Sequence, residues 1–190
     1  MRYVLLYTGI LLLAPLWLLC VAERRLRLGA GWFVGCAELL SLAPGRLGVL
    51  ARRSFYRMTL DACAADTHVG FGTVLAHPEA ELHPGVWIGS RCTVGQVVFE
   101  PDVTVGSNVD VLSGRHQHGF ERTDVPIQNQ GGRFVKLRVG RNSWLGNSSV
   151  VMADVGEHCV VGAAAVVVKP LPPRSVAVGN PAAVVKTRAA

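Results

Sequence analysis

Apolar residues recur at every sixth position over most of the chain beyond residue 75. Before a central gap the series consists of Ala76, Leu82, Ile88, Val94, Phe99, Val105 and Val111, with one step of five at Phe99. After the gap it consists of Val139, Leu145, Val151, Val155, Val161 and Val167, with one step of four at Val155. An α-helix repeats its apolar face every 3.6 residues and a half-buried strand every second residue, so a period of six fits neither. The pattern indicates an internal repeat that stacks into a solenoid.

Each unit of the repeat has a preferred composition around its apolar position. The next residue is often glycine, as at Gly89, Gly95, Gly106, Gly140, Gly146, Gly156 and Gly162. A small or β-branched residue commonly stands four places after the apolar one, as at Cys92, Val109, Ser149 and Cys159. We interpret each unit as a short strand followed by a sharp corner, where glycine supplies backbone freedom. Three units would then close one triangular turn around a column of Ile, Val and Leu.

The gap in the repeat, between Val111 and Val139, is polar and too long for a single unit. Its Gly, Arg, Gln, Asp and Asn residues are typical of a surface loop. Residues 112–138 are therefore predicted to leave the solenoid as an excursion. Two histidines, His116 and His118, stand near its start, and neutral imidazole is suited to taking a proton near pH 7.

The amino-terminal sixty residues have a different character. Tyr3 to Ala22 contains no charged residue and is long enough to cross a bilayer as a helix, although Pro15 would kink it. Arginines then alternate with apolar residues up to Met58, a pattern that favours a helix in the membrane interface with its arginines reaching lipid phosphates. We predict that residues 1–60 form a helical, membrane-associated segment on the cytoplasmic face of the cell (inner) membrane. Whether residues 3–22 span the bilayer or lie in its interface stays open.

Two other interpretations of this segment compete with membrane association. Cys20-Val21-Ala22 could be the cleavage site of a signal peptide, and the segment could also be a helical hairpin buried in protein. Its basic residues contain no recognised nucleic-acid-binding motif, so no nucleic-acid partner is expected.

Length and composition limit the organisation of the chain. It has 190 residues with a formal net charge of +6, enough for one domain with an appendage and too short for two ordinary domains. The cysteines occur singly, without CxxC spacing, so we expect free thiols rather than a disulfide framework or a zinc site.

The chain resembles the left-handed parallel β-helix acyltransferases in its hexapeptide units, which read IGSRCT, VGSNVD, VGRNSW, LGNSSV, VGEHCV and VGAAAV. The resemblance runs from near Val69 to Lys186. It implies a mainly β fold in which a left-handed parallel β-helix of about five turns occupies residues 67–186, behind the helical segment. Because members of this family are trimers with active sites between subunits, it also implies a homotrimer.

The carboxy-terminal units resemble the closing pattern of the same family. There the last turns form one wall of a groove for acetyl-CoA. The resemblance implies cofactor-binding roles for Trp144, Gly146, Ala164, Ala165, Lys169 and Lys186, with backbone contacts from the glycine and alanines and phosphate contacts from the lysines. The chain departs from the pattern at Ala165, where serine is common, and at Ala183, where lysine is common.

The resemblance also implies a catalytic histidine at the root of the excursion. Ser113-Gly114-Arg115-His116 matches one form of the family motif, whereas the Gln-His-Gly of other members points to His118. We favour His116 as the general base, with the second imidazole orienting the first or binding the acceptor. Glu121 or Asp124 could orient the imidazole, as a carboxylate does in a catalytic triad.

The function that follows from this resemblance is acetyl transfer from acetyl-CoA to a sugar hydroxyl, in a polysaccharide or lipid-linked glycan precursor, with no metal. Sugar nucleotidyltransferases with the same coil need a glycine-rich phosphate loop ahead of it, which this chain lacks. A γ-class carbonic anhydrase needs three histidines converging on zinc; His77 and His83 lie six apart and His116 and His118 two apart, which departs from that pattern. A zinc enzyme of this class and a non-catalytic scaffold stay as alternatives.

Overall fold

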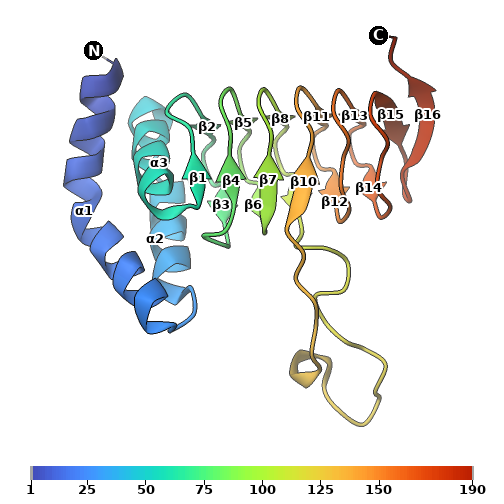
Figure 1. Ribbon diagram of the computed structural model, residues 1–190, viewed down its shortest axis with the longest axis horizontal. Helices are drawn as coiled ribbons and strands as arrows, with labels where there is room; N and C mark the ends of the chain where they lie inside the picture. Colours follow the sequence, from blue (N-terminus) through green and yellow to red (C-terminus); the bar gives the residue numbers. More distant parts are fainter. Residues whose placement is uncertain (1, 190) are drawn as a thin grey trace.

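A computed structural model describes residues 2–189, with side chains from Thr8 onward. A layer of helices covers one end of a β-solenoid, and the carboxy terminus lies at the other end (Figure 1). The helices are α1 (Arg2–Leu26), α2 (Gly31–Ser41) and α3 (Gly45–Thr59). The first strand of the solenoid follows α3 after two residues, at Ala62.

The solenoid is a parallel β-helix with three sheets. The four-stranded sheet has the order β1-β4-β7-β10, the seven-stranded sheet β16-β15-β13-β11-β8-β5-β2, and the five-stranded sheet β14-β12-β9-β6-β3. The chain visits the three sheets in turn, and all strand pairs are parallel except the final antiparallel pair of β15 and β16. The strands are β1 Ala62–Cys63, β2 His68–Val69, β3 Val74–Leu75, β4 Glu81–Leu82, β5 Trp87–Ile88, β6 Thr93–Val94, β7 Val97–Phe99, β8 Thr104–Val105, β9 Asp110–Val111, β10 Leu137–Val139, β11 Trp144–Leu145, β12 Val150–Val151, β13 Val160–Val161, β14 Val166–Val167, β15 Ser175–Val178 and β16 Ala183–Thr187.

The core consists of columns of apolar residues, as the repeat predicted. In the seven-stranded sheet the column reads Val69, Ile88, Val105, Leu145, Val161 and Ala177. In the five-stranded sheet it reads Leu75, Val94, Val111, Val151 and Val167. These side chains are fully buried, and so are the predicted second positions Cys92, Val109, Ser149 and Cys159. Each turn thus buries its apolar residues on copies above and below, which stabilises the stack through the hydrophobic effect.

The first position of the predicted series was wrong by one residue. Leu75 points inward and is fully buried, whereas Ala76 is only half-buried. The step from Leu75 to Leu82 therefore has seven residues. The additional residue is accommodated in a turn in which the Ala80 N–H donates to the His77 carbonyl at 3.2 Å.

The role predicted for the glycines was also wrong in its physical reason. A Cβ on Gly106 would lie 2.8 Å from the backbone nitrogen of Asn147. A Cβ on Gly146 would lie 2.6 Å from the backbone nitrogen of Ala163. These glycines are needed because neighbouring turns approach closely, not because the corner needs a left-handed conformation. That conformation occurs two positions later, where φ is +56° at Asn108 and +59° at Ser148. Residues with a Cβ adopt it at a cost in free energy.

The helical layer is anchored to the first turn of the solenoid by a buried arginine. Arg52, on α3, is 1% exposed and donates hydrogen bonds to the carbonyl oxygens of Val69 (3.0 Å), Leu40 (3.0 Å), Ser41 (3.3 Å) and Ala43 (2.7 Å). The expectation that the arginines of this segment reach lipid phosphates is therefore wrong for Arg52. Its Nε and Nη1 groups make all four of these hydrogen bonds and satisfy carbonyl groups that would otherwise be buried without partners, whereas Nη2 is buried without a partner among the described residues.

The apolar side of α3 also faces protein. Phe55 and Tyr56 are fully buried, and the Phe55 ring stacks on Phe33 of α2 at a centroid distance of 5.8 Å. The Tyr56 hydroxyl accepts a hydrogen bond from the backbone N–H of Leu75, in the first turn, at 3.1 Å. The apolar side of α3, which was predicted to lie in the membrane interface, thus packs on the end of the coil.

Among residues 2–189, none of the helices combines the length and the apolar character that crossing a bilayer requires. The five cysteines are free thiols, and all except Cys63 are buried. Burial raises the pKa of Cys92 and Cys159 above the usual value for a thiol.

Candidate active site

The excursion leaves the solenoid after β9 and returns at β10, and it extends well away from the coil (Figure 1). It contains one short 3₁₀ turn, η1 (Ile127–Asn129). The exit and return lie on the edge between the five-stranded and four-stranded sheets, because β9 belongs to the former and β10 to the latter. We call residues 112–136 the histidine loop.

The two legs of the histidine loop are joined by backbone hydrogen bonds. The N–H of Val135 donates to the carbonyl of Ser113 at 2.9 Å, and that of Arg133 donates to the carbonyl of His116 at 2.7 Å. A Cβ on Gly132 would lie 1.8 Å from the Gln117 carbonyl oxygen, so only glycine allows the legs to approach this closely. The backbone of His116 is thereby fixed, even though the loop has little apolar core.

His116 and His118 line the same hollow in the loop, which has a volume of about 330 Å³. The sequence placed them two residues apart, and the folded loop keeps both at one concave surface. The Nε of Arg115 donates a hydrogen bond to Nε2 of His116 at 2.9 Å. A guanidinium has no acceptor, so Nε2 must hold the lone pair. This contact was not anticipated from the sequence.

The two carboxylates considered as orienting groups have different surroundings. Asp124 forms an ion pair with Arg122 at 2.5 Å, and this hydrogen bond holds the pKa of Asp124 below its usual range. Glu121 lines the hollow that contains the two histidines. Glu121 is therefore the better placed of the two, and the orienting role remains a prediction.

The positions predicted to bind the cofactor lie mostly at another edge of the coil. Trp144 is 52% exposed on β11, in the seven-stranded sheet. Gly146 and Ala164 are in adjacent turns between the seven-stranded and five-stranded sheets, where the Ala164 N–H donates to the Asn147 carbonyl at 2.9 Å. The two turns therefore form one continuous ridge.

The backbone N–H groups at these turns are already engaged within the coil. Gly146 donates to Val161 at 2.8 Å, and Ala165 donates to Gly162 at 3.2 Å. Ala165 is also fully buried, so its Cβ faces the core. Lys169 and Lys186 are both exposed; Lys169 follows β14 on the edge from which the histidine loop emerges, and Lys186 lies in the terminal strand β16.

Within one chain, the two parts of the predicted site therefore lie apart. The structure brings Gly146, Ala164 and Ala165 together at one edge of the triangular coil. The same coil carries His116 and His118 on the loop that leaves a different edge. Contact between them within one chain would require the loop to fold around a whole sheet.

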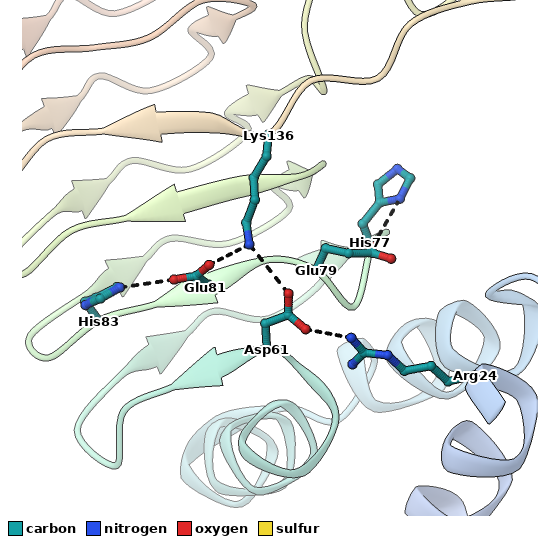
Figure 2. Close-up of polar contacts among 7 residues, drawn as sticks. All are labelled: Arg24, Asp61, His77, Glu79, Glu81, His83 and Lys136. Carbon is teal, nitrogen blue, oxygen red and sulfur yellow. Dashed lines mark hydrogen bonds and ion pairs between the residues drawn. The ribbon is translucent and has the colours of Figure 1, made fainter.

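A network of charged residues at the root of the histidine loop was missed in the sequence (Figure 2). The Nζ of Lys136 lies 2.5 Å from Oε1 of Glu81 and 3.5 Å from Oδ2 of Asp61, and Asp61 also accepts from Arg24 at 2.8 Å. The hydrogen bond from Lys136 lowers the pKa of Glu81, against the opposite effect of burial. Burial would lower the pKa of Lys136, but the Glu81 and Asp61 carboxylates raise it overall. These residues are far apart in sequence, so no local pattern could have revealed the network.

The other histidines are distributed over separate contacts. His68 stacks on Trp87 at a centroid distance of 4.8 Å, and the His77 ring lies against Phe134 at a centroid distance of 5.7 Å. His83 lies 3.4 Å from Glu81, and His158 occupies a corner with φ +58°. Within the described part of the chain, no three His, Cys, Asp or Glu side chains are placed to hold a metal ion.

Comparison with known proteins relates the chain to acetyltransferases. No family model matches the chain. A protein of Staphylococcus aureus (strain COL), named provisionally as an acetyltransferase, is 32% identical over 111 residues, which are 56% of this chain and 54% of that protein. One of Mycobacterium tuberculosis, also named provisionally as an acetyltransferase, is 38% identical over 140 residues, covering 60% of this chain and 47% of that protein. The chain thus spans about half the length of the curated relatives it matches.

Solved structures extend the similarity to nearly the whole chain. A maltose O-acetyltransferase from Clostridium difficile 630 superimposes with a TM-score of 0.72 at 21% identity, covering 90% of this chain and 89% of that one. A galactoside acetyltransferase in complex with coenzyme A gives a TM-score of 0.62 at 20% identity, covering 87% of this chain and 81% of that one. At these identities the superpositions establish a shared fold. The resemblance to hexapeptide-repeat acyltransferases, inferred from the six-residue period, is thereby confirmed for the fold of this chain.

Proposed function

We propose that this protein transfers the acetyl group of acetyl-CoA to a hydroxyl group of a sugar. The observation that carries the proposal is that the histidine loop, the one long interruption of the described coil, places the imidazoles of His116 and His118 at one hollow. Two further findings support it. Solved structures with this fold are named for maltose and galactoside acetylation, and relatives that match about half of the chain are named provisionally as acetyltransferases.

The proposed chemistry uses Nε2 of His116 as the general base. The Nε–H of Arg115 occupies the position that an acceptor O–H would take on binding. The imidazole accepts the hydroxyl proton while the hydroxyl oxygen attacks the thioester carbonyl of acetyl-CoA. The tetrahedral intermediate then expels the CoA sulfur, which takes the proton back from the imidazolium. His118, at the same hollow, is the alternative base or a group that binds the acceptor.

Acetyl-CoA binding is assigned to the ridge formed by the turns of Gly146 and Ala164, beside Trp144. Because the N–H groups of Gly146, Ala164 and Ala165 are used within the coil, the ridge would contribute mainly a smooth surface for the pantetheine arm. Lys169 and Lys186 would provide positive charge for phosphates. No metal takes part in the proposed reaction.

A complete site would require a homotrimer. The separation of the histidine loop from the cofactor ridge within one chain supports this part of the proposal. In a closed trimer, the loop of one subunit would lie over the ridge of the next, because cyclic symmetry repeats the same contact at each interface.

The acceptor is proposed to be a glycan of a polysaccharide or a lipid-linked precursor on the cytoplasmic face of the membrane. The basic and apolar character of residues 1–60 supports a membrane-bound acceptor over a free sugar.

The proposal is tested by following the release of CoA thiol from purified full-length protein with maltose, galactosides and glycan acceptors. Thiol release should depend on an acceptor. His116→Ala or His118→Ala should lower the rate by about 10²- to 10⁴-fold, the usual contribution of a general base. His158→Ala, which removes an imidazole at a coil corner, is the matched control and should keep the rate. Full activity in both loop variants would contradict the proposal and favour a non-catalytic scaffold.

A further inference from the structure

The outer side of α1 is an exposed apolar surface. Leu11, Leu12, Leu18 and Leu19 are 76%, 75%, 58% and 43% exposed, and Leu26 is 67% exposed at the end of the helix. Leu11 and Leu18, Leu12 and Leu19, and Leu19 and Leu26 are each seven residues apart, which places the five leucines on one face of the helix. Pro15 and Ala22, also exposed, fill the same face, so no charged side chain interrupts it before Arg25.

The opposite side of α1 is packed against protein. Gly9 lies against α3 so closely that a Cβ would be 2.5 Å from the Ser54 hydroxyl oxygen. Cys20 is buried, and so is Glu23, whose carboxylate oxygens accept from the backbone N–H groups of Trp32 (2.8 Å) and Phe33 (3.0 Å) at the start of α2. One side of α1 thus belongs to the folded cap, and the apolar side has no partner in the described structure.

Other parts of the helical layer also expose apolar side chains. The connection to α2, α2 itself and the segment after it expose further large side chains, namely Leu28 (66%), Trp32 (59%), Leu39 (65%) and Leu42 (67%). The five exposed leucines on one face of α1 form an apolar surface of the kind that marks a site of membrane or protein contact.

The charges around the surface are mostly positive. Arg25 and Arg27 are exposed at the end of α1, beside Leu26 and Leu28. Of the two glutamates in this part of the chain, Glu23 is buried as the cap of α2, and Glu38 is exposed. Leucines bordered by arginines are complementary to acyl chains beneath anionic headgroups.

We propose that α1 lies in the plane of an anionic bilayer, with Leu11, Leu12, Leu18 and Leu19 among the acyl chains and Arg25 and Arg27 at the headgroups. This resolves the choice left open by the sequence in favour of an interfacial helix, because its packing on α3 would be lost if it crossed the bilayer. Figure 1 shows α3 between α1 and the solenoid, so the coil would extend away from the membrane. If the proposed trimer forms with parallel coils, three such helices would bind one membrane together, and their affinities would reinforce one another.

Vesicle flotation of the full-length protein tests the proposal. We expect it to float with vesicles of phosphatidylglycerol and phosphatidylcholine, and much less with phosphatidylcholine alone or in high salt. Leu11→Gln/Leu18→Gln should weaken binding by about tenfold or more, because two apolar anchors are lost while helix propensity is retained. Arg25→Gln/Arg27→Gln should reduce binding to anionic vesicles and its dependence on salt.

Ile127→Gln is the matched control, since Ile127 is 57% exposed on the histidine loop, away from the cap. It should float as the unmodified protein does. Two results would overturn the proposal: full-length protein that stays out of anionic vesicles at low salt, or a leucine variant whose main effect is a smaller mass by light scattering. The second result would assign the surface to another copy of the chain. Acetyl transfer to a soluble acceptor is a separate measurement, so its failure would not affect this outcome.

Discussion

Arg115 and His116 are joined by a hydrogen bond from Nε to Nε2 at 2.9 Å. The bond occupies the lone pair that the proposed base must use. We predict that Arg115→Ala makes His116 react several-fold faster with diethyl pyrocarbonate, which attacks an unprotonated imidazole nitrogen. The rate is measured by mass spectrometry of the loop peptide. The rate at His118 serves as the internal reference and should not change; equal rates at His116 in both proteins would show that the bond does not persist in solution.

The corners of the coil provide a pair of substitutions with opposite expected effects. Gly106→Ala should lower the free energy of unfolding by about 1–3 kcal/mol, because its Cβ would be forced against Asn147 of the next turn. Ala164→Gly should raise it by about 0.5–1 kcal/mol, because alanine at φ +58° is strained and glycine is not. Denaturant unfolding measures both. Stabilisation by Gly106→Ala would show that neighbouring turns are not in close contact there.

The stability of the protein should depend on an arginine at position 52. Lysine has one ammonium group and cannot reach the carbonyls of Val69 and Ala43 from opposite sides, so Arg52→Lys should destabilise the protein by about 1.5–3 kcal/mol. Thermal unfolding checks the loss. Arg46→Lys, an exposed position on the same helix, is the control and should have little effect. Similar melting temperatures for both variants would contradict a structural role for the buried guanidinium.

The contact between Glu81 and Lys136 should make part of the stability depend on pH. The pKa of Glu81 is below its usual value of 4.5 in the folded protein. Its contribution is therefore complete above that pH and is lost as the pH falls through the folded-state pKa. The difference in unfolding free energy between the unmodified protein and Glu81→Gln should be largest at neutral pH and vanish in acid. A difference that stays constant down to pH 2 would show that the ion pair contributes nothing.

The periodic part of the sequence predicted the structure most accurately. The six-residue spacing identified the inward residues of nearly every turn, because a solenoid repeats one local environment and burial selects the same kind of side chain each time. It was wrong at Ala76, where one seven-residue step shifts the inward position to Leu75. It also assigned the wrong reason to the glycines, since close approach between turns depends on residues 15 or more positions away, such as Ala163 next to Gly146.

The candidate site was predictable only in part. The break in the repeat predicted a loop carrying His116 and His118, because an interruption is visible without knowledge of the fold. The Arg115 contact and the Lys136 network depend on where side chains lie after the loop has folded, so spacing gave no sign of them.

The sequence by itself determined the parallel β-helix, the position of its loop and the helical character of the first sixty residues, since each rests on a local pattern of burial and polarity. Only the tertiary structure decided which surfaces remain available. It buried Arg52 and the apolar side of α3 at the end of the coil, and it left the leucines of α1 exposed. It also placed the histidine loop and the ridge formed by the turns of Gly146 and Ala164 on different edges. The physical reason is that local patterns specify which residues prefer burial, whereas the packing of distant elements decides which of them find a partner.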